Sequence, residues 1–119
     1  MITLNLDDII YKILESVSNV YEGWYREELK ATHTTFFCYM DEENLSDDEP
    51  EDIILNFQFD TWGAKKEEVE KQRKKVRKLL KQNEFILMDN RNDFESETGI
   101  YHYADRFSFM VDAEEYYLE

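Results

Sequence analysis

The stretch from Ile53 to Leu80 most constrains the fold, because its hydrophobic period changes at a single point. From Ile53 to Trp62 apolar and polar residues alternate, which is typical of a β-strand with one face in the core. After Gly63 the period becomes helical, and the expected helix runs to about Gln82. Its narrow apolar stripe consists of Val69, Val76, Leu79 and Leu80. A strand followed by a helix is therefore the frame on which the rest of the chain is expected to pack.

A second helix and three more strands are expected around this frame. Residues from Leu6 to about Val17 follow the i, i+3, i+4 spacing of an amphipathic helix, and Asn5 is placed to cap it. Aromatic and β-branched residues predict strands elsewhere. These strands are Thr34–Met40, Phe85–Asp89 and Ile100–Val111, the last interrupted in its alternation by Asp105.

The resulting αββαββ order predicts an α+β fold, with a four-stranded, mainly antiparallel sheet and two helices packed on it. A chain of 119 residues fits a single domain spanning 1–119. Within it, 41–52 is expected to be an exposed, mobile acidic loop, and 90–99 a polar connection. The acidic tail, 112–119, is expected to be free to fray.

Charge is distributed unevenly along the chain. The net charge of -14 excludes nonspecific binding to duplex DNA, which needs many basic contacts to phosphates. Eight of the twelve residues in 41–52 are acidic, whereas nine of the 14 basic residues lie in 65–81. Such runs are usually solvated surfaces that keep a protein soluble. The sharper hypothesis is a contact between subunits, in which the basic helix of one copy meets the acidic loop of the next.

Two sets of candidate site residues follow from this hypothesis. The expected subunit interface comprises Asp47, Asp48, Glu49, Trp62, Lys74, Arg77 and Lys78. Trp24 and Tyr25 form a candidate partner patch, because Trp and Tyr favour interfaces, although such a cluster also serves as a lid over a core. The loop could instead line a conduit for DNA, whose phosphates its charge would repel.

No constellation of residues points to catalysis. His102 and Asp105 are three apart on an expected strand, so they point to opposite faces and are poorly placed to share a metal. The acids in Asp89–Glu97 resemble a calcium loop, but Arg91 stands at a ligand position and Phe94 where glycine is required. Glycine-rich phosphate loops and nucleophile motifs are absent from the sequence. We expect a protein that is not an enzyme and has no cofactor.

The sequence also indicates the cellular compartment of the protein. Cys38 is the only cysteine, so no disulfide can form within the chain, which fits a reducing environment. The start at Met1 has no secretory signal pattern, and no apolar run approaches the ~20 residues of a membrane span. A cytoplasmic location and no membrane partner are expected.

Three segments carry a resemblance to a known family. They are FQFDTWG at Phe57–Gly63 before the charged helix, NEFIL at Asn83–Leu87, and ETGIYHYADRFSFMV at Glu97–Val111. Together they resemble the small tail-completion or tail-terminator proteins, which join head and tail in long-tailed phages and prophages. Glu84 departs from the pattern, since a glycine often stands there. Phage head-closure and minor capsid proteins are neighbouring alternatives.

The resemblance implies a structural protein that caps the tail tube as a ring, with six subunits expected. Its partners would be copies of itself, the tail-tube protein and a head-completion protein, with no sequence-specific nucleic acid. It would be made in the cytoplasm of the bacterial host and end in the virion tail. The charge leaves a second function open, an acidic inhibitor or DNA mimic of the antirestriction type. A small binding module of cellular origin is a third.

Overall fold

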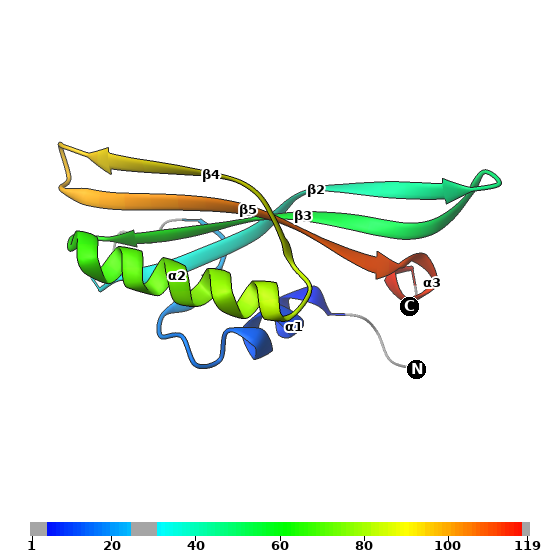
Figure 1. The fold of residues 1–119 in the computed structure, drawn as a ribbon, viewed down its shortest axis with the longest axis horizontal. Coiled ribbons are helices and arrows are strands. Elements are labelled where there is room, and N and C mark those ends of the chain that lie inside the picture. The colour runs from blue at the N-terminus through cyan, green and yellow to red at the C-terminus, as the bar shows by residue number, and fades with distance from the viewer. Residues whose placement is uncertain (1–4, 25–30, 118–119) are drawn as a thin grey trace.

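In a computed structural model, described for residues 5–24 and 31–117, the chain forms one five-stranded sheet and three helices. In chain order the elements are α1 (Leu6–Ile13), β1 (Val20–Glu22), β2 (His33–Ser46), β3 (Glu49–Gly63), α2 (Lys66–Gln82), β4 (Ile86–Glu95), β5 (Ile100–Asp112) and α3 (Ala113–Tyr116). Figure 1 shows β2 and β3 running on together past the other strands.

The sheet has the strand order β1-β2-β3-β5-β4, in which β1 lies parallel to β2 and all other neighbours are antiparallel. The α+β class and the two hairpins agree with the prediction. The predicted four strands and two helices were too few, because β1 and α3 were not expected. With three and four residues, these elements are too short to show a period of their own.

Helix α1 begins as predicted and ends early. The side chain of Asn5 accepts a hydrogen bond from the backbone N–H of Asp8 at 3.1 Å, which caps the helix. The helix stops at Ile13 and not near Val17. Leu14 and Val17 are nevertheless buried, so turns continue the apolar face that the spacing indicated.

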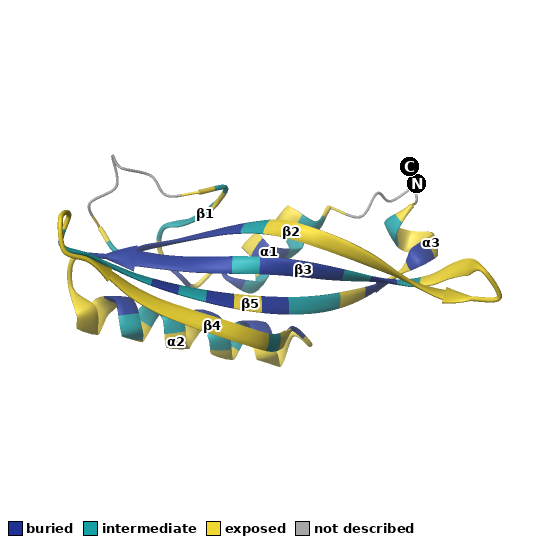
Figure 2. Cartoon of the chain, turned by 90° about the horizontal axis from the view of Figure 1, so that it is seen from above, coloured by how far each residue is buried: buried dark blue, intermediate teal, exposed yellow. Residues whose placement is uncertain are grey.

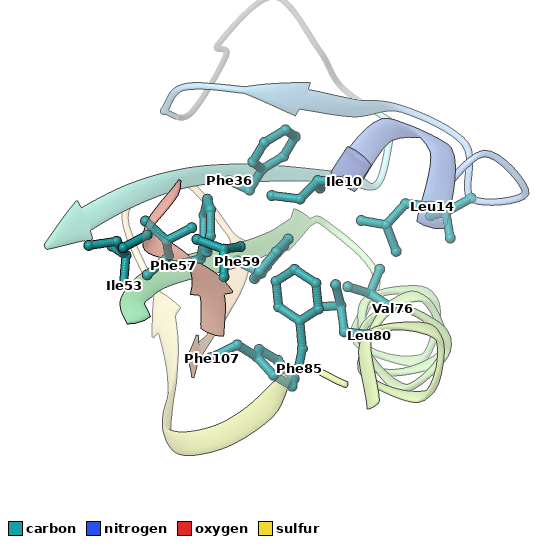
Figure 3. Packing of buried hydrophobic residues seen from close by; sticks show 14 residues of the cluster. Ile10, Leu14, Phe36, Ile53, Phe57, Phe59, Val76, Leu80, Phe85 and Phe107 are labelled. Carbon is teal, nitrogen blue, oxygen red and sulfur yellow. The ribbon is translucent and has the colours of Figure 1, made fainter. Parts of the chain in front are cut away.

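The three helices share a single core with one face of the sheet. Ile10 of α1, Val76 of α2 and Ala113 of α3 belong to the same buried cluster as Phe59 and Phe107 of the sheet. Figure 3 shows the phenylalanines of β3 and β5 pointing toward the side chains of the helices. The predicted inward row of β3 is confirmed, and it consists of Ile53, Leu55, Phe57 and Phe59.

The Trp62-Gly63 break has a steric cause. A Cβ atom on Gly63 would lie 2.7 Å from the Thr32 Oγ1 atom and 2.7 Å from a methyl carbon of Val69, distances that real Cβ atoms do not adopt. Glycine is therefore required because the end of β3 passes close to the start of α2.

Glu84 lies in the left-handed region, with φ 69°, directly after α2. The Phe85 N–H donates to the Leu80 carbonyl at 3.0 Å, and the Glu84 N–H donates to the Lys81 carbonyl at 3.3 Å. This pair of bonds is the Schellman ending of a helix, whose left-handed position usually holds glycine. Glu84, which departs from the family pattern, therefore adopts a backbone conformation that usually holds glycine.

Two segments expected to be irregular are regular. β4 continues to Glu95, so most of the predicted connection 90–99 is strand, and a tight turn at Gly99 (φ 71°) leads into β5. In the described part of the tail, Ala113–Tyr116 form α3, which Asp112 caps by accepting a hydrogen bond from the Glu114 N–H at 2.8 Å. Asp112 followed by Glu115 is the spacing of a capping box, a signal from which this helix was predictable.

Candidate functional site: an acidic arm and a basic helix

The segment 41–52, expected to be a mobile loop, is the end of the β2–β3 hairpin, and we call it the acidic arm. Its strands stay in register as far as Ser46 opposite Glu49. The turn residues Asp47 and Asp48 have φ values of 53° and 64°, as a two-residue type I′ turn requires. Figure 2 shows the arm exposed along both strands. Its eight carboxylates are thus held on a β-ribbon, because Asp tolerates the left-handed turn conformation.

The C-terminal helix anchors the base of the acidic arm. The Tyr116 hydroxyl donates to Asp41 Oδ2 at 2.8 Å, and the Tyr117 hydroxyl donates to Glu43. From β3, the Asn56 amide donates to Glu42 Oε1 at 3.1 Å. Sequence reasoning missed these anchors, since 74 or 75 residues separate each tyrosine from its partner.

A pH titration tests the Tyr116 anchor. The hydrogen bond to Asp41, together with burial, raises the pKa of Tyr116 to about 12. A raised tyrosine pKa means that the folded state favours the neutral hydroxyl, so this stabilisation is present below pH ~10 and is lost as pH rises through 12. We expect tyrosinate absorbance to show a component near pH 12 that disappears in Tyr116→Phe. A variant that loses a component near pH 10 and keeps the component near pH 12 would contradict the anchor.

Helix α2 divides its basic side chains between the core and the surface. Arg73 and Arg77 turn inward to Asp105: the Arg77 Nη2 atom lies 2.7 Å from Oδ1, and the Arg73 Nε atom lies 3.3 Å from Oδ2. Lys74 and Lys78 are exposed. With Arg77, Lys81 and Gln82 they line a shallow hollow of about 410 Å³. This exposed face of α2, formed by Lys74, Lys78 and Lys81, is called the lysine row below.

Charged side chains of α2 make contacts within their own chain that the helical spacing does not indicate. Arg77, proposed for a subunit interface, holds Asp105 within its own chain. Glu70 stands four residues before Lys74, the spacing of a helical ion pair, but it accepts a hydrogen bond from the Tyr103 hydroxyl at 2.9 Å. Glu67 and Lys71 have the same spacing, but they do not form one of the ion pairs of the described residues.

Trp62 is buried and cannot serve as an exposed interface residue. Only 4% of it is accessible, its ring stacks on His102 at 3.6 Å, and its indole N–H donates to Thr35 Oγ1 at 3.1 Å. Trp24 covers it edge-on, with ring centroids 5.6 Å apart, and is itself 53% exposed. Trp24 thus covers Trp62 as a lid, while about half of its own surface remains exposed. Tyr25 lies outside the described residues.

The outer face of β3, expected to be polar, holds a buried hydrogen-bonded network. His102 Nε2 lies 2.5 Å from Oδ1 of the fully buried Asp60. Gln58 donates to the same carboxylate at 3.0 Å and accepts from Arg106 Nε at 3.1 Å. Buried polar groups need such partners, which explains why polar residues are tolerated here. His102 and Asp105 point apart, as predicted.

The His102–Asp60 pair can be compared with the carboxylate-held imidazoles of catalytic sites. A carboxylate-held imidazole activates a nucleophile only when a hydroxyl or thiol reaches its other nitrogen. Among the described residues, His102 has no hydrogen bond to a hydroxyl or thiol. No group of three or more potential metal ligands occurs in residues 5–24 and 31–117. The histidine instead fixes the packing of Trp62.

Geometry and charge together define a small α+β protein with two separate, oppositely charged surfaces. Models of known protein families contain none that matches the chain. Comparison with curated proteins likewise gives no match. No helix in the described part of the chain is both long and apolar enough to cross a membrane.

Proposed function

We propose that this chain is a non-enzymatic structural protein of a long-tailed phage or prophage, which assembles into a ring that caps the tail tube and joins it to the head. The observation that carries the proposal is the pair of complementary surfaces on rigid elements. The acidic arm is a hydrogen-bonded ribbon anchored by α3, and the lysine row lies on a 17-residue helix. Figure 1 shows the arm extending away from the helix of its own chain.

Two different surfaces that meet between copies generate head-to-tail association, which closes into a ring or continues as a filament. Opposite charges would speed the encounter and set the orientation. In this proposal the ring has six subunits, as the family resemblance implies. The tail-tube protein and a head-completion protein are its other partners. The ring would assemble in the host cytoplasm and remain in the virion tail, with no sequence-specific nucleic acid, membrane or cofactor.

Charge reversal in the lysine row tests this proposal by sedimentation. We expect the wild-type protein to form a closed oligomer at low salt, visible as rings in negative-stain electron micrographs. Lys74→Glu with Lys78→Glu should weaken association at least tenfold, and rising salt should weaken the wild-type oligomer. Arg77 is left intact because it holds Asp105.

The matched control reverses two exposed lysines at the other end of the same helix, Lys65→Glu with Lys66→Glu, and should leave association unchanged. A wild-type protein that stays monomeric at all concentrations would contradict the proposal. So would equal losses in the two double variants.

The arm also strengthens the second candidate, an acidic inhibitor or DNA mimic. Mimicry needs carboxylates at regular intervals on a rigid surface, and alternate residues of a strand stand about 6.6 Å apart on one face. The acidic arm supplies such rows, whereas a mobile loop would not. This function predicts a monomer or dimer that binds a basic DNA-binding protein in competition with duplex DNA. A salt-sensitive closed oligomer without such competition would favour the tail-ring proposal.

A further inference from the structure

The sheet presents an apolar surface on the face that the helices leave uncovered. On this face Ile54 of β3 stands opposite Met110 of β5, and Ile86 of β4 stands opposite Ser108. Ile86 is 62% exposed and Met110 is 56% exposed. Two exposed methionines lie on this face, Met110 and Met40, the latter opposite Asn56 of β3. Methionine adapts its shape readily and is common at surfaces that bind partners.

A hollow forms where β4 begins. β4 pairs with β5 only from Ile86 opposite Ser108 onward, so the end of β5, 109–112, has no β4 neighbour. The hollow has a volume of about 370 Å³. We call it the sheet notch and define it by the apolar residues Ile54, Ile86 and Met110 and the carboxylates of Asp52, Glu84 and Asp112. No basic side chain lines it.

An apolar floor with a carboxylate rim suits a lysine side chain. The aliphatic stem of lysine packs on apolar surface while its ammonium group stays at the polar edge. The lysine row of α2 offers three such side chains, and its residues 74, 78 and 81 follow the spacing of one helix face. Lys74 and Lys81 are separated by about 10 Å along the helix axis, from a rise of ~1.5 Å per residue. The distance from β3 to β4, across β5, is about 9.6 Å. The sheet notch and the lysine row therefore match in length.

We propose that the sheet notch of one copy receives the lysine row of a second copy. The inference rests on the self-association in the proposed function and deepens it by naming the acceptor surface. The helix of the same chain cannot fill the notch, because α2 packs on the opposite face of the sheet. The acidic arm adjoins the notch at Asp52, so both would contact the neighbouring helix together and enlarge the interface beyond what the notch alone buries.

Substituting a lysine into the sheet notch tests this contact. Met110→Lys changes an exposed side chain and should leave the fold intact, while its charge repels the lysine row. We expect sedimentation to show association weakened at least tenfold. Ile86→Lys, on a different strand, should act in the same way. Phe94→Lys is the matched control, since Phe94 is a half-exposed apolar residue of β4 outside the notch, and it should associate like wild type.

A second substitution, which exchanges the charges between the two surfaces, gives the decisive test. Lys78→Glu should restore a large part of the association lost in Met110→Lys, because the two charges would then attract. An oligomer of normal stability in Met110→Lys would overturn the notch contact and leave the tail-ring proposal standing. An equal loss in Phe94→Lys would also overturn it. A wild-type protein without any oligomer would defeat both proposals.

Discussion

Replacing Asp105 by alanine is expected to lower the free energy of unfolding by about 3 kcal/mol, because breaking a buried ion pair leaves charges without a partner. The Asp105 side chain is only 3% accessible, and it holds two guanidinium groups, of Arg73 and Arg77. Arg73 also lies over the Tyr103 ring, 5.2 Å from its centroid. The loss should appear as a lower midpoint in urea denaturation with an unchanged slope.

The control for this prediction is Asp93→Ala, which removes an exposed carboxylate from the neighbouring strand β4. Exposed substitutions of this kind usually change stability by about 0.5 kcal/mol or less. Comparable losses in the two variants would show that Asp105 acts only through the net charge of the protein. Added salt should leave most of the effect in place, since buried pairs are screened weakly.

Replacing Phe59 by alanine is expected to lower the free energy of unfolding by about 4 kcal/mol, because it leaves a cavity in the core. Phe59 is 2% exposed and lies at the centre of an aromatic cluster. Its ring centroid is 5.8 Å from that of Phe36, 5.8 Å from that of Phe107 and 6.3 Å from that of Phe85. Removing the Phe59 ring leaves a cavity. This cavity is bordered by aromatic rings from two other strands and one loop.

Phe59→Leu should recover more than half of that loss, because leucine fills most of the cavity. Phe94→Ala serves as the control, since its ring is half-exposed and its truncation should cost less than about 1 kcal/mol. Thermal or urea denaturation measures all three variants. Equal losses for Phe59→Ala and Phe94→Ala would contradict the placement of Phe59 at the centre of the core.

The acidic arm shows that a strand rich in acidic residues is difficult to predict from the sequence. Eight acids in twelve residues predicted a loop, because they offer no apolar alternation. Both strands of the arm nevertheless follow directly from the predicted strands Thr34–Met40 and Ile53–Trp62. The Asp47-Asp48 pair, suited to a type I′ turn, was the local signal that a hairpin continued. The arm is a pair of strands because the backbone hydrogen bonding between β2 and β3 continues from the core to the turn.

The candidate interface residues illustrate what sequence reasoning could not separate. Arg77 and Lys78 are neighbours in a basic run, yet Arg77 is bound to Asp105 and Lys78 is free at the surface. Asp105 looked like a break in the alternation of β5, although it points inward in phase with Tyr103 and Phe107. A partner 28 residues away on another element makes this charge acceptable in the core.

The sequence by itself determined the long helix, the central strands, the inward row of phenylalanines and the uneven charge, because periodicity and composition are local properties of the chain. The short strand β1, the anchoring of the acidic arm by α3 and the burial of Trp62 were decided only by the tertiary structure. They depend on contacts between segments far apart in the chain, such as Tyr116 with Asp41, and on a register that only the assembled sheet defines. The sheet notch belongs to this second group, since three strands must meet to form it.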